Sequence, residues 1–199
     1  ACAPYRRLHL CHHNLETIDT KSTTHDLLAE VCMAAKYEGN SINTHYTIHK
    51  ETNPGTASQL CTVLARSFAD IGDIVRGRDL FYGNTQEKTK RDQLENNLKT
   101  IFKKIYEGLT KANGVKSRYN DDYPNYYKLR EDWWYANRET VWKAITCDVK
   151  GNRYFRATCV DNENTATQAK KQCRCDGANI VPTYFDYVPQ FLRWFEEWA

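Results

Sequence analysis

Histidines and cysteines lie close together at three places in the sequence, where they could be tested as metal ligands. These places are the cluster His9, Cys11, His12 and His13, the pair His45 and His49, and the motif Cys173-Arg174-Cys175. A structural zinc site usually combines two closely spaced pairs of ligands. None of the three places has that paired spacing. The sequence therefore favours surface histidines and disulfide-bonded cysteines, and we expect no metal and no other cofactor. A secreted metal-dependent protein is the alternative that these clusters leave open.

Acidic residues that could do acid–base chemistry occur in the sequence ADIGDIVRG, which contains Asp70 and Asp73. Both fall on the polar side of a predicted amphipathic helix, which favours solvated or salt-bridged carboxylates. The chain has no G-x-S-x-G, H-E-x-x-H or phosphate-loop motif. Thiol catalysis is not expected where cysteines are mostly oxidised. We therefore expect that the protein is not an enzyme.

Basic residues are concentrated between Glu87 and Arg118, where nine of them face four acidic residues. They are Lys88, Lys90, Arg91, Lys99, Lys103, Lys104, Lys111, Lys116 and Arg118. This segment carries a local excess of five positive charges (nine minus four), whereas the whole chain carries +3. A charge run often only solvates an exposed helix face, but an excess of one sign also suits a surface that binds polyanions. We take these nine residues as candidates for binding a glycan or a receptor.

Tryptophan is concentrated between Arg130 and Cys147, in the sequence REDWWYANRETVWKAITC. Such indoles could form a stacking surface for sugars or bases, or they could pack in a core. Trp134 and Trp142 share one face of a predicted helix and Trp133 lies on a neighbouring face, which favours packing in a core. The predicted core scaffold consists of Trp133, Trp134, Trp142, Phe68, Ile71 and Trp194.

The periodicity of apolar residues predicts a mostly helical chain, and 41% hydrophobic content is enough to bury a core. A helix is expected from Thr23, where Thr23 and Asp26 fit a capping box, to Gly39, followed by a loop over 40–55. Further helices are expected near 56–76, where Thr56 and Gln59 form a second capping box, and near 86–112, 127–146 and 189–199. The segments 113–126 and 148–180 are expected to be loops, and no alternating pattern predicts a strand.

Eight cysteines are an even number, and most of their spacings are irregular. This favours disulfides and an extracellular location. Cys61 is expected to pair with one of the later cysteines and so to tie two helices together. No apolar run approaches the roughly 18 residues of a membrane span, and no signal peptide opens the chain. The abrupt ends suggest a piece of a larger protein, with any secretion signal or anchor outside it.

Four sequence blocks resemble those of one family, the Duffy-binding-like domains. They are CAPYRRLHLC (Cys2–Cys11), RSFADIGDIVRGRDLF (Arg66–Phe81), REDWWYANRETVWKAITC (Arg130–Cys147) and VPTYFDYVPQFLRWFEEW (Val181–Trp198). The blocks occur in the family's order over nearly the whole chain. The first block, the DIGDI core and the PQFLRWFEEW ending together resemble the alpha type, found in the Plasmodium falciparum erythrocyte membrane protein family.

The resemblance implies an all-α fold of three subdomains cross-linked by disulfides. Residues 1–55 would be part of the first subdomain, rich in cysteines and loops with one helix, and 56–199 would be the helical second subdomain. The third subdomain would be absent. We also expect a disulfide between Cys2 and Cys11, because eight intervening residues form a short loop and the same two cysteines frame the first family block.

The resemblance further implies adhesion. Such domains lie on the extracellular face of the infected host erythrocyte membrane, as parts of a larger membrane-anchored protein. The implied partners are red-cell or endothelial receptors, heparan sulfate-like glycosaminoglycans, blood-group sugars and complement receptor, with rosetting as a result. Host antibodies would bind the variable surface, and neighbouring domains of the same chain would contact it. The alternative is a structural or immune-decoy module whose neighbours bind the receptor. No nucleic acid is expected as a partner.

Overall fold

The computed structural model describes residues 2–21, 23–52, 59–109, 115–152, 154, 157–160, 166–169, 171–175 and 180–198. The α-helices are α1 (Tyr5–Leu8), α2 (His13–Glu16), α3 (Thr24–Thr52), α4 (Gln59–Arg76), α5 (Thr85–Gly108), α6 (Tyr127–Ile145) and α7 (Gln190–Trp198). Two 3-10 helices, η2 (Lys116–Tyr119) and η3 (Phe185–Tyr187), and two strands, β1 (Ala157–Val160) and β2 (Ala166–Gln168), complete the described elements. The chain is thus mostly helical, as the sequence predicts.

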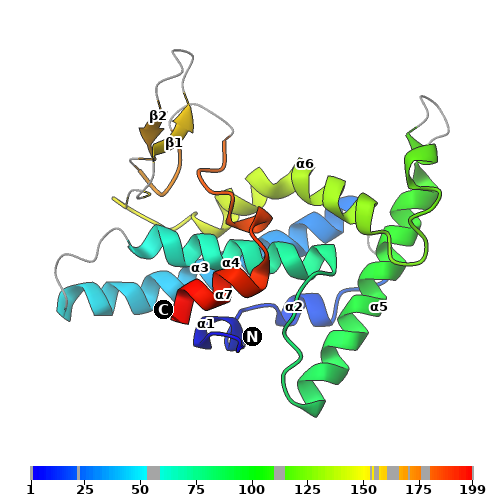
Figure 1. Ribbon diagram of the computed structural model, residues 1–199, viewed down its shortest axis with the longest axis horizontal. Helices are drawn as coiled ribbons and strands as arrows, with labels where there is room; N and C mark the ends of the chain where they lie inside the picture. The colour runs from blue at the N-terminus through cyan, green and yellow to red at the C-terminus, as the bar shows by residue number, and fades with distance from the viewer. Residues whose placement is uncertain are drawn as a thin grey trace.

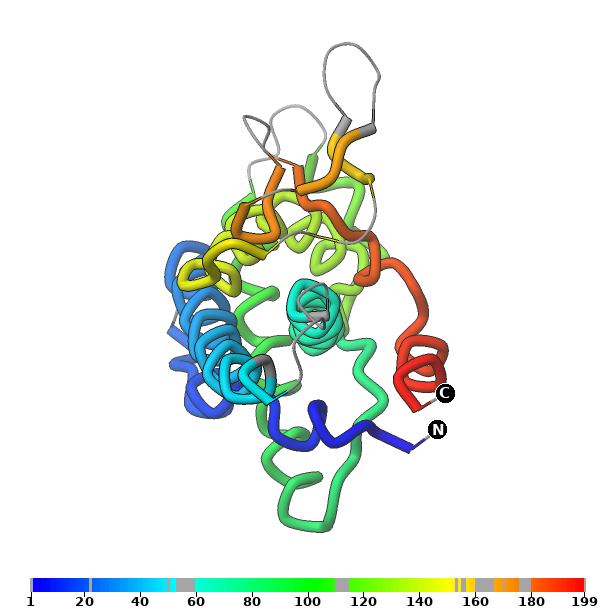
Figure 2. The backbone as a smooth tube through the Cα atoms, turned by 90° about the vertical axis from the view of Figure 1, so that its left-hand side faces the viewer, coloured from blue at the N-terminus to red at the C-terminus, as the bar shows by residue number. Residues whose placement is uncertain are grey.

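Helix α4 lies at the centre of the molecule, with α3, α6, α7 and α1 arranged around it (Figures 1 and 2). Apolar side chains recur along it every three or four residues and are buried, namely Leu60, Leu64, Phe68, Ile71 and Val75. Its opposite side is buried too, although it carries Asp70, Asp73 and Arg76. Because a buried charge is costly unless it is paired, these side chains need partners from the surrounding elements.

Helix α3 continues through Gly39 to Thr52, so the predicted stop at Gly39 and the predicted loop over its described part, 40–52, are wrong. A Cβ atom on Gly39 would lie 2.0 Å from the carbonyl oxygen of Ile145, which ends α6. The glycine therefore lets the backbones of α3 and α6 approach closely, and it does not end the helix. The predicted cap at the start of α3 is present, because Asp26 accepts a hydrogen bond from the backbone N–H of Thr23 at 2.8 Å.

Replacing Gly39 by alanine is expected to lower the free energy of unfolding by about 1–3 kcal/mol, the usual range for overpacking. Helix propensity alone would give the opposite sign, since alanine is favoured over glycine by about 1 kcal/mol inside a helix. Gly108, at the end of α5, is a matched control because nothing lies within 4 Å of its missing Cβ. Urea denaturation of both variants measures the difference, and equal stability of Gly39→Ala and Gly108→Ala would contradict the packing argument.

The three tryptophans of α6 are buried, and so are the other predicted core residues, Phe68, Ile71 and Trp194. The ring of Phe68 packs against Trp134 and Trp142, with ring centroids 5.1 and 5.2 Å apart. Trp134 Nε1 donates to the Asp186 carboxylate at 2.9 Å, and Trp142 Nε1 donates to the Cys173 carbonyl at 3.1 Å. The indoles thus form a core, in which the ring nitrogens of Trp134 and Trp142 are paired, and not a surface on which sugars could stack.

The segment after α6 contains an antiparallel pair of short strands, β1 and β2, which the sequence did not predict. Strands of four and three residues are too short to show an alternating pattern. Two disulfides hold this segment, Cys61–Cys173 and Cys159–Cys175. Cys61 therefore pairs with a later cysteine as expected, but Cys173 lies in a turn, so the bond ties α4 to an irregular segment and not to a second helix.

The predicted disulfide between Cys2 and Cys11 is wrong, because both cysteines are free thiols in this structure. Their backbones are held by different parts of the fold. Trp198 Nε1 donates to the carbonyl of Cys2 at 3.1 Å, and the N–H of Cys11 donates to Glu38 at 3.0 Å. Burial, followed by the nearby Glu38 carboxylate, raises the pKa of the Cys11 thiol to about 11.

Helix α7 has its amphipathic faces in an unusual orientation. Its inner face carries Gln190, Arg193 and Trp194, whereas Phe195 and Trp198 are 74% and 63% exposed. Phe191 and Leu192 are exposed beside them. The inner face carries the polar side chains of Gln190 and Arg193 because it meets the carboxylates of α4. Four apolar residues are therefore left on the outside of the helix.

The predicted boundary near residue 55 stays a prediction. Helix α3, before that boundary, packs against α4 and α6, which follow it. Among the helices in the described ranges, none is both long enough and apolar enough to cross a membrane.

Candidate functional site

Eight of the nine predicted basic residues are in the described ranges, and six of these lie on α5. Lys111 lies outside the described residues. A capping box between Asn84 and Glu87 starts α5, and Leu94, Leu98, Ile101 and Phe102 form its buried stripe. At about 100° per residue, the stripe separates the basic side chains into two groups. Lys88, Lys99 and Lys103 share one flank of the helix, and Lys90 and Lys104 share the other.

The flank formed by Lys88, Lys99 and Lys103 is called the outer lysine flank below. Lys99 lies 3.9 Å from Glu95 and Lys103 lies 3.8 Å from Glu107, each one helical turn away. Lys88 is exposed, and within the described part of the chain its side chain has no ion-pair or hydrogen-bond partner. Exposed pairs of this kind contribute about 0–1 kcal/mol, so an anionic ligand can replace them at little cost.

The lysines of the other flank connect α5 to the N-terminal segment. Lys90 Nζ lies 3.5 Å from Glu16 in α2, and Lys104 Nζ donates to the carbonyl of Thr20 at 2.8 Å. Figure 1 shows α2 beside α5. These two lysines hold α5 in place, so they are less available to a ligand than the outer lysine flank.

Lys116 and Arg118 belong to η2 and are engaged locally. Lys116 Nζ donates to the carbonyl of Glu107 at 3.1 Å and lies 4.8 Å from the ring centre of Tyr106. Arg118 pairs with Asp132 at 3.0 Å. The structure therefore does not gather the predicted basic residues into one patch. It brings three together on the outer lysine flank and assigns the other five described ones to contacts within the protein.

Arg91 is half-buried and lines a cavity of about 230 Å³ between the N-terminal segment and α5, which is called the Arg91 cavity below. Its lining consists of Leu8, His9, Leu10, Cys11, His12, His13, Glu16, Phe81, Glu87, Lys90 and Arg91. The sequence indicated the histidine cluster as a possible metal site, but it gave no sign that α5 would complete a cavity with it. In the described residues no group of three or more histidine, cysteine or acidic side chains is arranged to hold a metal ion.

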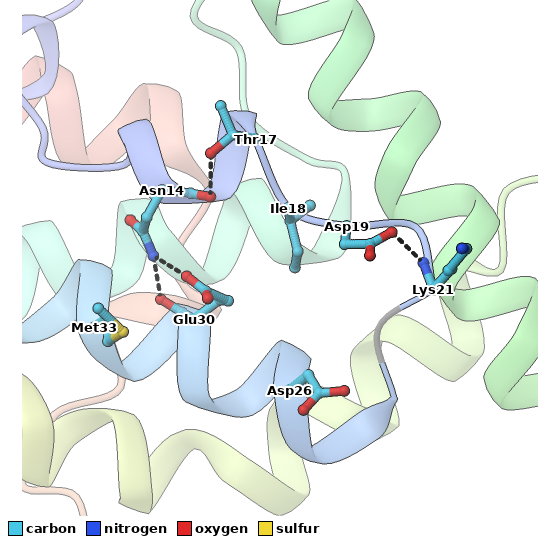
Figure 3. A pocket seen from close by; sticks show the side chains of 8 residues that line it. All are labelled: Asn14, Thr17, Ile18, Asp19, Lys21, Asp26, Glu30 and Met33. Carbon is cyan, nitrogen blue, oxygen red and sulfur yellow. Dashed lines mark hydrogen bonds between the residues drawn. The ribbon is translucent and has the colours of Figure 1, made fainter.

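A larger open pocket of about 650 Å³ lies between α2 and α3 (Figure 3). Its acidic side chains are used locally. Glu30 accepts from the Asn14 amide at 2.9 Å, and Asp19 accepts from the backbone N–H of Lys21 at 2.8 Å. Asp26 caps α3. With three carboxylates and one lysine among its lining residues, this pocket does not suit an anionic ligand.

Asp70 and Asp73 are buried and ion-paired. Of the two states that the sequence left open for these carboxylates, they are therefore salt-bridged and not solvated. Arg6 and Arg193 each approach Asp70 to 2.7 Å, and Arg193 approaches Asp73 to 2.5 Å. Burial alone would raise the pKa of Asp70, but Arg6 and Arg193 outweigh it and hold that pKa below its usual value. Burial raises the pKa of Asp73 despite the opposing effect of Arg193. These carboxylates fasten α1 and α7 to α4.

Comparison with known families gives a match over nearly the whole chain. The sequence model of the Duffy binding domain matches residues 1–193. Two Plasmodium knowlesi proteins, the beta and gamma forms of the Duffy receptor, are 24% and 23% identical over 211 and 205 residues. The alignments cover 100% of this chain but 14% and 15% of those receptors. The chain therefore spans a small part of each curated relative.

Solved structures give a stronger likeness. The NTS-DBL1(alpha-1) domain of Plasmodium falciparum membrane protein 1 (PfEMP1) from the varO strain is 47% identical with a TM-score of 0.81. That match covers 100% of this chain and 43% of the solved one. A double domain with CIDR-gamma from the same strain is also 47% identical, with a TM-score of 0.82 and 27% coverage of the solved chain. A DBLb domain of PfEMP1 bound to human ICAM-1 is 30% identical over 97% of this chain, with a TM-score of 0.66 and 38% coverage of the solved chain.

Proposed function

Because the chain belongs to the Duffy binding domain family, whose members are host receptor-binding adhesion modules and not enzymes, we propose that it is an adhesion domain that binds an acidic host glycan. The observation that carries this proposal is the outer lysine flank. Its three lysines lie on one exposed side of α5 and have at most weak local partners. At about 1.5 Å per residue they extend over roughly 22 Å of helix, which suits an extended polyanion.

The proposed ligand class is a heparan sulfate-like glycosaminoglycan on red cells or endothelium. Sulfates along such a chain could meet Lys88, Lys99 and Lys103 in turn, while the disulfide-tied core keeps α5 in place. Blood-group sugars and protein receptors are the competing ligands. PfEMP1 is a parasite surface antigen, which supports a location on the extracellular face of the infected erythrocyte within a larger membrane-anchored protein. Exposure to host antibodies, antigenic variation and rosetting would follow from that location.

Heparin is expected to bind the chain, and its affinity is expected to fall roughly 10–50-fold between about 50 and 200 mM salt, as three charge contacts imply. Changing Lys88, Lys99 and Lys103 to glutamate should lower the affinity at least roughly tenfold and flatten the salt dependence. Surface plasmon resonance on immobilised heparin measures both effects.

The matched control is a triple variant with the same change in net charge elsewhere on the surface. Lys21, Lys36 and Lys128 are exposed lysines outside α5 and serve this purpose. Their change to glutamate should lower the heparin affinity much less. An equal loss in both triple variants would mean that only the net charge matters, and it would remove the argument for the outer lysine flank.

The second candidate function is a structural or immune-decoy module whose neighbouring domains bind the receptor. It is favoured by the internal contacts of basic residues such as Lys104, which donates to the Thr20 carbonyl, and Arg118, which pairs with Asp132. A folded chain that binds neither heparin nor red cells would support this candidate over adhesion.

A further inference from the structure

Two guanidinium groups converge on one carboxylate behind the Arg91 cavity. Arg7 is fully buried, and its Nε and Nη2 donate to Asp79 at 3.1 and 2.7 Å. Arg91 Nη2 pairs with the same carboxylate. Gln190 also donates to Asp79, at 2.7 Å. One negative charge therefore serves two buried or half-buried positive charges, and buried charges are normally matched by partners of opposite sign.

The two guanidinium groups also have unused donors. Arg7 Nη1 and Arg91 Nη1 are both buried, and neither has a hydrogen-bond partner within the described ranges. Buried N–H groups in proteins are almost always paired. The centre of the Phe81 ring lies 4.7 Å from the guanidinium carbon of Arg7 and 5.8 Å from that of Arg91. The aromatic ring thus covers one side of the two guanidinium groups. Because both Nη1 nitrogens are buried, an anion in the Arg91 cavity would meet the accessible part of Arg91, whose side chain is 16% exposed.

The two acidic groups that line the Arg91 cavity, Glu16 and Glu87, are engaged with other partners. Glu87 accepts from the backbone N–H of Asn84 at 2.7 Å in the capping box of α5. Glu16 lies 3.5 Å from Lys90 and 3.4 Å from His12 Nε2. Burial is the main cause of the lowered pKa of His12; Arg7 and Arg91 lower it further, whereas the Leu10 carbonyl and Glu16 oppose the shift.

We propose that the Arg91 cavity binds a single oxyanion group, a sulfate or a carboxylate carried by an acidic sugar, with Arg91 as its main ligand. This subsite rests on the proposed binding of an acidic glycan and adds a specific pocket to it. A cavity of about 230 Å³ is smaller than most ligand pockets, which measure about 300–1,000 Å³. It therefore suits one charged substituent with part of a sugar ring, and not an extended chain.

The neighbouring cavity of about 220 Å³, which Arg91 also lines, is a poorer candidate. It contains Asp79, Asp92 and Glu95 against Arg91 and Lys99. This excess of carboxylates disfavours an anion there.

The test uses glucosamine 6-sulfate and glucuronate as probes for the two oxyanions, with uncharged N-acetylglucosamine as the control sugar. Isothermal titration calorimetry of the whole chain should show saturable binding of at least one charged probe and none of the neutral sugar. Arg91→Gln should weaken that binding at least roughly tenfold. Because loss of the contact with Asp79 could unfold the chain, Leu8→Trp provides a second variant, which adds bulk to the lining of the cavity without changing a charge and should weaken binding similarly.

The two proposals fail separately. Leu8→Trp should still bind immobilised heparin through the outer lysine flank, and the outer-flank triple variant should still bind the charged monosaccharide. The oxyanion subsite is overturned if no charged probe binds the folded chain, if the neutral sugar binds equally well, or if folded Leu8→Trp and Arg91→Gln both bind as the parent does. Failure of the unaltered chain to bind heparin, while the charged monosaccharide still binds it, would instead count against the outer lysine flank.

Discussion

Replacing Asp186 by alanine is expected to lower the free energy of unfolding by about 3–5 kcal/mol, the cost of leaving a buried charge without its partner. The Asp186 carboxylate accepts two hydrogen bonds from Arg138, both at 2.8 Å, and one from Trp134 Nε1 at 2.9 Å. Burial alone would lower the pKa of Arg138, but Asp186 outweighs it and raises that pKa. Without Asp186 the guanidinium stays charged, and only the Thr183 carbonyl still accepts from it.

Urea denaturation followed by circular dichroism measures this loss without relying on Trp134 fluorescence. Asp121, an exposed aspartate, is the control, and its change to alanine should alter stability by less than about 0.5 kcal/mol. A double variant, Asp186→Ala with Arg138→Met, should be more stable than Asp186→Ala alone, because it removes the unpaired cation. If the double variant were less stable than the single one, loss of packing and not loss of charge pairing would be the cause.

The helices near the centre of the fold could be predicted because their apolar residues repeat at helical spacing. This holds for α4, α5 and α6, where Phe68, Leu98 and Trp142 fall on the expected buried faces. The Thr23 and Asp26 cap could also be predicted, because it depends only on residues three apart. In these cases the structure follows from neighbouring residues in the chain.

What could not be predicted depends on residues far apart in the sequence. Gly39 resembles a helix stop until the carbonyl of Ile145 is placed beside it. Asp70 lies on a polar face that a local pattern assigns to solvent, but Arg193, 123 residues away, covers it. The Arg91 cavity has the same origin, since His12 and Arg91 meet only after folding. The sequence therefore shows which residues are charged, but it does not show which of these side chains remain available to a ligand after folding.

Removing the disulfide between Cys61 and Cys173 by changing both cysteines to alanine is expected to cost about 4–5 kcal/mol on the chain-entropy account. The bond closes a loop of 112 residues, so its loss greatly increases the freedom of the unfolded chain. It also releases the Cys173 carbonyl that accepts from Trp142 Nε1. Urea denaturation under non-reducing conditions measures the effect, with loss of near-ultraviolet circular dichroism reporting on the tryptophan core.

The second disulfide supplies the matched control, because Cys159 and Cys175 are separated by only 16 residues. Its removal should cost about 3 kcal/mol on the same account, and the α4 core should keep its near-ultraviolet signal. If both double variants lost the same stability, loop entropy would not be the dominant effect, and local packing of the cysteines would explain the result. A larger loss for Cys61–Cys173 would show that this bond, by fastening the irregular segment to α4, supports the core against which α5 and its lysines are held.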